Sequence, residues 1–108
     1  MSNEINKPHF ISIVIPTLNI SDDIIRCLDS IKKLDYPKKY VNIIVWDNGS
    51  TDGTQAEVSK AFREMGKDEV WKGLNLIQSE KNLGVYTSRD ELFKSISPET
   101  EYVLSLDD

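Results

Sequence analysis

The chain has 108 residues, of which 39% are hydrophobic and 29% are charged, and its formal net charge is −5. These values are typical of one soluble globular domain, and the acidic balance excludes the basic surface that nucleic acid requires. The apolar runs reach about five residues, whereas a membrane-spanning helix needs roughly 20. No signal peptide is visible, because residues 1–8 are polar. The only cysteine, Cys27, excludes an internal disulfide and favours the reducing cytosol. We therefore expect a cytoplasmic protein, while peripheral membrane association of a longer parent stays open.

The first half of the chain predicts a strand and a helix. Residues 1–9 form a polar lead-in, in which His9 is expected to be solvated. A strand is expected over residues 10–15, ended by Pro16. The helix is predicted to run from an N-cap at Ser21 to the vicinity of residues 36–37, because proline disfavours helical geometry in the residue before it. Its apolar face carries Ile24, Cys27, Leu28 and Ile31.

The second half alternates in the same way. A strand over residues 41–46 is nearly continuously apolar, as a strand buried on both faces is. The turn-forming residues 47–53 lead into a helix that begins at Thr54. Its candidate buried positions are Ala56, Val58, Ala61, Phe62 and Met65. A strand over 74–77, a turn at 82–84, a helix over 85–96 and a strand over 102–106 follow.

This β-α-β-α-β-α-β order predicts an α/β fold with a mostly parallel sheet covered by helices on both faces, a three-layer α/β/α arrangement. In such sheets ligands bind beyond the carboxyl ends of the strands. Three polar segments lie just past strand ends, namely residues 16–17, 47–49 and 107–108. We therefore expect them to converge at one edge of the sheet.

The acidic pair Asp107 and Asp108 follows the last apolar strand directly. Divalent cations such as Mg²⁺ or Mn²⁺ prefer oxygen ligands and commonly take one or two carboxylates together with substrate phosphates. A metal held there would neutralise the charge that develops on a diphosphate leaving group. From the spacing alone, a solvated acidic tail explains the pair equally well.

The loop over residues 47–53 contains two carboxylates and two glycines. Asp47 can accept a hydrogen bond from a base or a sugar hydroxyl, and Gly49 permits close approach of the backbone to a ligand. Asp52 and Gly53 are interpreted as structural parts of the turn. The sequence lacks both GxxxxGK[ST] and a GxGxxG after the first strand, which argues against a P-loop and a dinucleotide-binding domain.

Arg89 lies near the start of the predicted third helix. Its guanidinium could bind a phosphate or a base carbonyl with bidentate geometry. The alternative is a surface arginine paired with Asp90 or Glu91.

Together these segments resemble the N-terminal half of family 2 glycosyltransferases, which have the GT-A fold. The resemblance is carried, in matching order and spacing, by residues 11–19, 46–54, 82–84 with Arg89, and 104–108. It implies that residues 10–108 are the nucleotide-binding half of a GT-A domain, truncated within its acidic DxD-type motif.

The resemblance also implies an activity and a set of binding residues. A sugar would pass from a nucleoside diphosphate, with uracil as the expected base, to an acceptor hydroxyl with inversion. A divalent Mn²⁺ or Mg²⁺ would assist. The nucleotide-binding residues would be Pro16, Thr17, Asn19, Asp47, Asn48, Gly49, Arg89 and Asp107, and the metal ligands would be Asp108 and Asp107.

Some features depart from the family pattern. Asn48 stands where an aspartate is common, and Ile20 and Ser21 separate Asn19 from the next acid. The last acid of the motif would be residue 109, and the general base is expected beyond Asp108. We therefore expect the chain alone to be inactive. We also expect it to self-associate through an uncovered sheet edge. The acceptor could be a glycan, a lipid-linked sugar or a protein.

Two rival hypotheses remain. A sugar-nucleotide nucleotidyltransferase would carry a glycine-rich, basic loop after the first strand, and residues 16–19 are not one. A non-catalytic interaction module could keep the same sheet without the chemistry. Metal-dependent nucleotide binding would separate that module from both enzymes.

Overall fold

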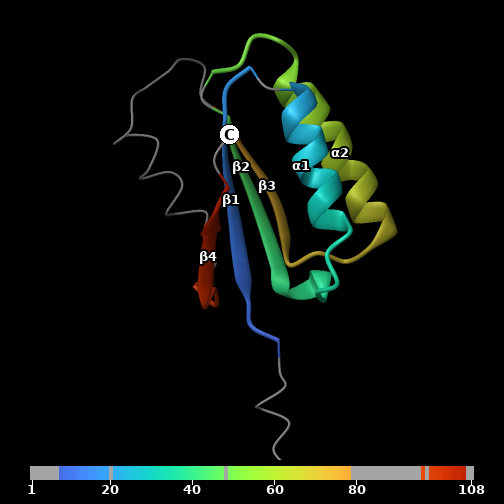
Figure 1. Ribbon diagram of the computed structural model, residues 1–108, viewed down its shortest axis with the longest axis vertical. Helices are drawn as coiled ribbons and strands as arrows, with labels where there is room; N and C mark the ends of the chain where they lie inside the picture. The colour runs from blue at the N-terminus through green and yellow to red at the C-terminus, as the bar shows by residue number, and fades with distance from the viewer. Residues whose placement is uncertain (1–7, 20, 48, 79–95, 97, 107–108) are drawn as a thin grey trace, which may run out of the picture.

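The computed structural model describes residues 8–19, 21–47, 49–78, 96 and 98–106. Four parallel strands form one sheet in the order β3-β2-β1-β4 (Figure 1). In chain order the elements are β1 (Ile11–Thr17), α1 (Ser21–Lys32), the 3₁₀ helix η2 (Lys38–Tyr40), β2 (Val41–Asp47), α2 (Thr54–Asp68), β3 (Gly73–Gln78) and β4 (Tyr102–Ser105). The predicted α/β class with a parallel sheet is confirmed.

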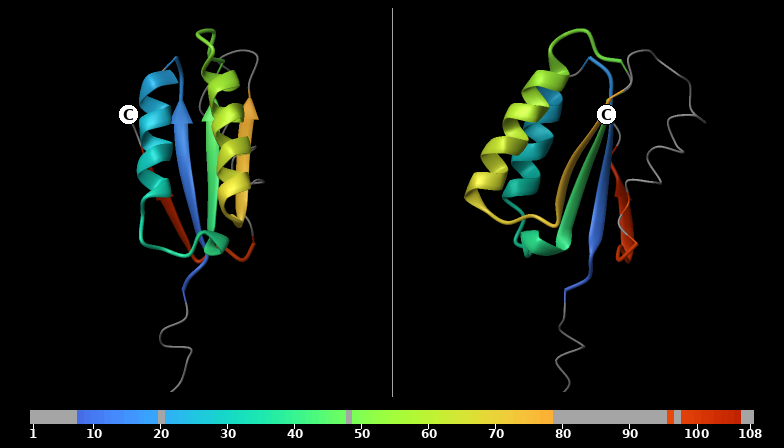
Figure 2. Two further views of the ribbon diagram at one scale, coloured as in Figure 1. Left: turned by 90° about the vertical axis from the view of Figure 1, so that its right-hand side faces the viewer. Right: turned by 180° about the vertical axis from the view of Figure 1, so that it is seen from behind.

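Both described α-helices cover the same face of the sheet (Figure 2). The main core lies between them and the odd-numbered positions of β1 and β2, and comprises Ile13, Ile15, Ile24, Leu28, Ile31, Val41, Ile43, Val45, Val58 and Met65. On the opposite face Val14 and Ile44 are buried and Ile96 packs against them. The rest of the predicted third helix, residues 85–95, lies outside the described residues. Within the part of the chain that the structure describes, no helix is long and apolar enough to cross a membrane.

The predicted end of the first strand was wrong, because β1 continues through Pro16 to Thr17. The Val14 carbonyl accepts a hydrogen bond from the Leu106 backbone N–H at 2.9 Å. The backbone polar groups of Val14, and the backbone nitrogen of Pro16 two residues later, therefore point toward β4. The pairing with β4 stops at Ser105, opposite Val14. Since the described pairing on that side ends before Pro16, its missing N–H removes no ladder hydrogen bond among the described residues.

The predicted end of the first helix was also wrong, since α1 ends at Lys32. The chain then tightens, with the Leu34 N–H bonded to the Ile31 carbonyl at 3.2 Å. Lys38 is buried, and its Nζ donates to the backbone carbonyls of Leu34 and Tyr36. This lysine satisfies carbonyls that would otherwise need water beyond a helix end. Pro37 precedes the 3₁₀ helix η2, which the sequence did not predict.

The predicted helix faces agree with the structure except at one position. Ile24, Leu28 and Ile31 are buried, and Cys27 is partly buried against the same core. In α2 the predicted apolar face holds, but Ala56 is exposed. It borders an open groove between the first turns of α1 and α2.

A row of polar side chains crosses the sheet face that α1 and α2 leave uncovered. Ser12 Oγ lies 2.7 Å from Thr100 Oγ1, and Asn42 Nδ2 donates to Ser12 Oγ at 3.2 Å. Asn75 Nδ2 donates to Asn42 Oδ1 at 2.7 Å. Ser12 and Asn42 are buried, so their mutual pairing avoids the cost of an unsatisfied polar group. We call these four side chains the polar row.

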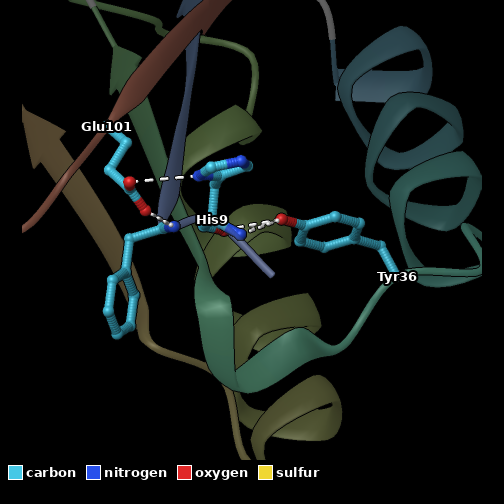
Figure 3. Close-up of polar contacts among 4 residues, drawn as sticks. His9, Tyr36 and Glu101 are labelled. Atoms are coloured by element: carbon cyan, nitrogen blue, oxygen red, sulfur yellow. Dashed lines mark hydrogen bonds and ion pairs between the residues drawn. The ribbon is translucent and has the colours of Figure 1, made fainter. Parts of the chain in front are cut away.

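The amino end of the sheet is tied together around His9 (Figure 3). The His9 N–H donates to the Tyr36 hydroxyl at 2.9 Å, and that hydroxyl donates to the His9 carbonyl at 2.6 Å. Glu101 lies 3.0 Å from His9 Nδ1 and accepts from the Phe10 N–H at 3.0 Å. His9 is exposed, as the sequence indicated, and it is also hydrogen-bonded.

Strand β4 is an edge strand with apolar side chains exposed on both of its faces. Tyr102, Val103 and Leu104 are 55%, 52% and 48% exposed. On the helix side, Leu104 borders an apolar groove of about 250 Å³ that Ile13, Ile31 and Leu34 also line.

Candidate functional site

The candidate site lies at the carboxyl ends of β1 and β2. Thr17 and Asp47 are the last residues of these strands and stand opposite each other in the register. The turn after Thr17 and the loop after Asp47 therefore start side by side. The predicted convergence is confirmed for the ends of β1 and β2, whereas the third predicted segment, residues 107–108, lies outside the described residues.

Asp47 is fully buried and holds its loop together. Its Oδ2 accepts the Ser50 backbone N–H at 3.1 Å and the Gln55 side-chain amide, and its Oδ1 accepts the Ser50 hydroxyl. The first turn of α2, where Gln55 lies, also favours a nearby negative charge. An ionised carboxylate has about four acceptor positions. The three donors among the described residues thus leave roughly one position, on Oδ1.

Asn19 links the two loops. Its backbone N–H donates to Ser50 Oγ at 2.8 Å, and its Oδ1 accepts the Thr51 N–H at 2.8 Å. Asn19 has a φ of 51°, in the left-handed region that asparagine tolerates better than most residues. This conformation allows both its main chain and its side chain to reach the same short segment. We call the two hydrogen bonds the Asn19 clasp.

The rest of the loop directs the chain into α2. Gly49 and Gly53 have φ values of 95° and 91°, which a side chain would strain. Asp52 Oδ1 accepts the Thr54 N–H at 3.0 Å and also the Thr54 hydroxyl. Asp52 and Gly53 therefore shape the start of α2, in agreement with their interpretation as parts of the turn.

Two buried polar atoms near this edge lack a partner within the described residues. They are Thr17 Oγ1, on the helix side of the sheet, and Trp46 Nε1 on the other side. Thr17 is only 3% exposed. A buried hydroxyl without a hydrogen bond is costly unless a water or a ligand satisfies it.

The structure brings together only part of the predicted site. Pro16, Thr17, Asn19, Asp47 and Gly49 lie at one edge. The predicted roles of Asn48, Arg89, Asp107 and Asp108 fall on residues outside those described. Across residues 8–19, 21–47, 49–78 and 98–106, no three His, Cys, Asp or Glu side chains gather in a way that could hold a metal.

Sequence reasoning missed the role of two neighbours of Asp47. Ser50 lies three residues after Asp47, a spacing at which a serine commonly bonds an aspartate in a turn, so the pattern could have revealed it. Gln55 carried no such signal, because its contact depends on the direction in which α2 leaves the loop.

Several solved structures share the fold of this chain. The structure of S. aureus TarS matches with a TM-score of 0.71 and 31% identity, over 90% of this chain and 16% of that one. TarS residues 1–349 in complex with UDP match with a TM-score of 0.69 and 32% identity, over 90% of this chain and 26% of that one. The mannosyltransferase PcManGT from Pyrobaculum calidifontis, solved with GDP-Man and Mn²⁺, has a TM-score of 0.65 at 23% identity, over 86% of this chain and 29% of that one, and supports the fold alone. The fold and the position of the site thus define an α/β domain of the GT-A glycosyltransferase type.

Sequence comparison identifies the family. The profile of Glycosyl transferase family 2 matches residues 12–108, and the chain belongs to that family. Glycosyltransferase AglE of Haloferax volcanii is 31% identical over 81 residues, which are 75% of this chain and 25% of AglE. A Methanococcus voltae enzyme, dolichyl N-acetyl-alpha-D-glucosaminyl phosphate 3-beta-D-2,3-diacetamido-2,3-dideoxy-beta-D-glucuronosyltransferase, is 35% identical over 78 residues, or 72% of this chain and 23% of the enzyme. The chain therefore spans about a quarter of the length of these relatives.

Proposed function

We propose that this chain is the donor-binding part of a glycosyltransferase that takes a sugar from UDP and transfers it with inversion to an acceptor hydroxyl. The observation that carries the proposal is the meeting of Thr17, Asn19 and the Asp47 loop at the carboxyl edge of the sheet. Ligands of parallel α/β sheets bind at this edge. The similarity to TarS, which was solved with UDP, supports uracil as the base.

In this proposal Asp47 accepts one N–H of the base. Uracil carries an imide N–H, which suits the one acceptor position that remains on the carboxylate. Because Asp47 is fully buried, the base must displace a group that now covers it. Pro16, Asn19 and Gly49 would line the pocket with Asn48. The Thr17 hydroxyl has no partner among the described residues and is available to a ligand or a water that reaches it.

The diphosphate end of the donor would lie toward the acidic pair. The two adjacent carboxylates of Asp107 and Asp108 fit the oxygen preference of Mn²⁺ or Mg²⁺, and Arg89 would pair with the nucleotide. When bound, such a cation supplies positive charge to the leaving diphosphate. β4 directs the chain toward this edge, since Leu106 still bonds to β1.

The acceptor-binding site and the catalytic base would lie outside residues 1–108. Among glycans, lipid-linked sugars and proteins, the lipid-linked sugar is the acceptor class that the name of the M. voltae relative supports. We expect the general base outside residues 1–108, so the chain alone would bind the donor without turnover. The single cysteine, Cys27, fits a cytoplasmic site of action.

The test is a calorimetric titration of the full-length protein with UDP, GDP and ADP, each with and without Mn²⁺. We expect selective UDP binding that Mn²⁺ strengthens. Asp47→Asn should weaken it at least about tenfold, since it removes the charge that faces the base N–H. Asp68→Asn, at the exposed far end of α2, is the matched control and should bind as the unsubstituted protein does.

Thermal unfolding of both variants separates loss of binding from loss of fold. Absence of binding to any nucleotide by a folded, unsubstituted protein would contradict the proposal and favour a non-catalytic module.

A further inference from the structure

We propose that Ser50 is a positioning residue of the nucleotide site, and that it fixes the turn after β1 relative to Asp47. The inference rests on the proposed function and adds to it a residue that reaches the nucleotide only through others. Ser50 is the one described residue that bonds to both Asn19 and Asp47.

The hydrogen bonds of the Ser50 hydroxyl have a defined direction. A serine hydroxyl has a single proton to donate, and here it goes to Asp47 Oδ1. Ser50 Oγ is thereby left as an acceptor, and it accepts the Asn19 N–H at 2.8 Å. The three groups form one directed chain, from the Asn19 amide through the Ser50 hydroxyl to the carboxylate. Each bond polarises the next, and its end on a buried charge strengthens the chain.

Ser50 also links the turn after β1 to the loop after β2. Ser50 contacts both oxygens of Asp47, one through its backbone N–H and one through its hydroxyl, which fixes the rotation of the carboxylate. The Asn19 clasp then holds the first turn against residues 50 and 51, although Asn19 lies 31 positions before Ser50. Asn19 and Thr51 are exposed, whereas Asp47 is not. Ser50 thus connects the exposed turn at Asn19 to the buried carboxylate of Asp47 by hydrogen bonds.

Removal of the Ser50 hydroxyl should weaken the connection between the two loops. Ser50→Ala keeps the backbone N–H on Asp47 but deletes the hydroxyl, so the Asn19 N–H and one carboxylate lone pair both lose their partner. Only the bond from the Thr51 N–H to Asn19 Oδ1 then links the two loops, and they can shift relative to each other. Since a binding site must be held within a fraction of an ångström of its productive geometry, donor affinity falls although no contact with the nucleotide is removed.

The experiment compares four variants of the full-length protein by UDP titration with Mn²⁺. Ser50→Ala should bind UDP about 10- to 100-fold more weakly, the loss that corresponds to hydrogen bonds on a charged group. Ser50→Thr retains the hydroxyl and should stay within about threefold of the unsubstituted protein. Asn19→Gly keeps the φ but loses the side-chain half of the clasp, and should show a smaller loss than Ser50→Ala. Ser30→Ala is the matched control, since its hydroxyl bonds to Arg26 O within α1 and its removal should leave UDP affinity unchanged.

A measurement without ligand makes the two proposals separable. Amide hydrogen exchange should show a protected Asn19 N–H that loses its protection in Ser50→Ala, while the core amide of Ile44 is unaffected. Unchanged UDP affinity in Ser50→Ala, or an equal loss in Ser50→Thr, overturns the inference and leaves the proposed function intact. Failure of the unsubstituted protein to bind UDP overturns the proposed function and the inference with it, even where the exchange data still show the hydrogen bond.

Discussion

At the residue scale, the buried charge of Asp47 is balanced by donors from a single loop and the first turn of a helix. The Gln55 amide is the only side-chain nitrogen among the described residues that donates to it. Gln55 is half-buried and covers the carboxylate, so a change of its donor into an acceptor acts directly on the buried charge.

Gln55→Glu should therefore lower the free energy of unfolding by about 1–3 kcal/mol at neutral pH, since it loses a donor and places a second carboxylate near the first. Urea denaturation followed by circular dichroism measures the loss. Gln55→Met removes the donor without adding a charge and should cost less. Identical midpoints for the two variants would show that repulsion between the carboxylates is not the cause.

The residues of the site were predictable to the extent that they depend on strand ends. Thr17, Asn19 and Asp47 follow apolar runs, and parallel strands bring their carboxyl ends to one edge. Of the internal partners of Asp47, Ser50 was predictable from its spacing in the turn. Gln55 was not, because its contact depends on the angle at which α2 starts.

At the element scale, the register of β2 and β3 is constrained by the polar row. Gly73 stands opposite Asn42, and a Cβ at Gly73 would overlap Asn42 Oδ1. That oxygen is buried and accepts from Asn75, so it can give way only by breaking hydrogen bonds. The glycine is therefore required by the neighbouring strand.

Gly73→Ala should destabilise the protein by about 1–3 kcal/mol, because Asn42 must move away from Asn75 and Ser12. Gly66→Ala is the matched control: nothing lies within 4 Å of its added Cβ in α2, and alanine should stabilise this helix by about 0.5–1 kcal/mol. Thermal unfolding of the two variants should thus shift in opposite directions. A Gly73→Ala protein as stable as the parent would contradict the constraint.

The elements themselves were largely predictable, and their ends were not. Apolar runs located all four strands, and the spacing of Ile24, Leu28 and Ile31 located α1. The helix stops before the proline that was expected to end it, because buried Lys38 satisfies the carbonyls beyond it. The contact is local in sequence, but a buried lysine that bonds to backbone carbonyls has no signature in the hydrophobic pattern.

At the scale of the whole molecule, the sheet formed by the described residues ends on one side in an exposed apolar strand, β4. Edge strands with apolar side chains and free hydrogen-bonding groups pair readily with other chains. β4 carries such side chains on both faces, and Leu104 adjoins the apolar groove beside α1.

We predict that the 108-residue chain self-associates through β4, and that Leu104→Lys shifts it toward the monomer, since a lysine on an edge strand opposes pairing. Sedimentation velocity across a concentration series measures the effect. Val70→Lys is the control, because Val70 is 80% exposed and precedes β3, which lies at the opposite end of the strand order from β4. A chain that stays monomeric at the highest concentration would refute the prediction.

The position of β4 also has a consequence for the order in which the chain folds. β1 pairs with β2 across about 30 positions, as Ser12 and Asn42 illustrate, but with β4 across about 91, as Phe10 and Glu101 do. Closing the longer loop costs about 1 kcal/mol more entropy. During synthesis, β1, β2 and β3 can assemble with their helices while the outer edge of β1 is still bare. Of the described strands, the one that leads to the acidic pair joins last, so the proposed metal-binding end of the site would be completed only after the proposed nucleotide-binding loops have formed.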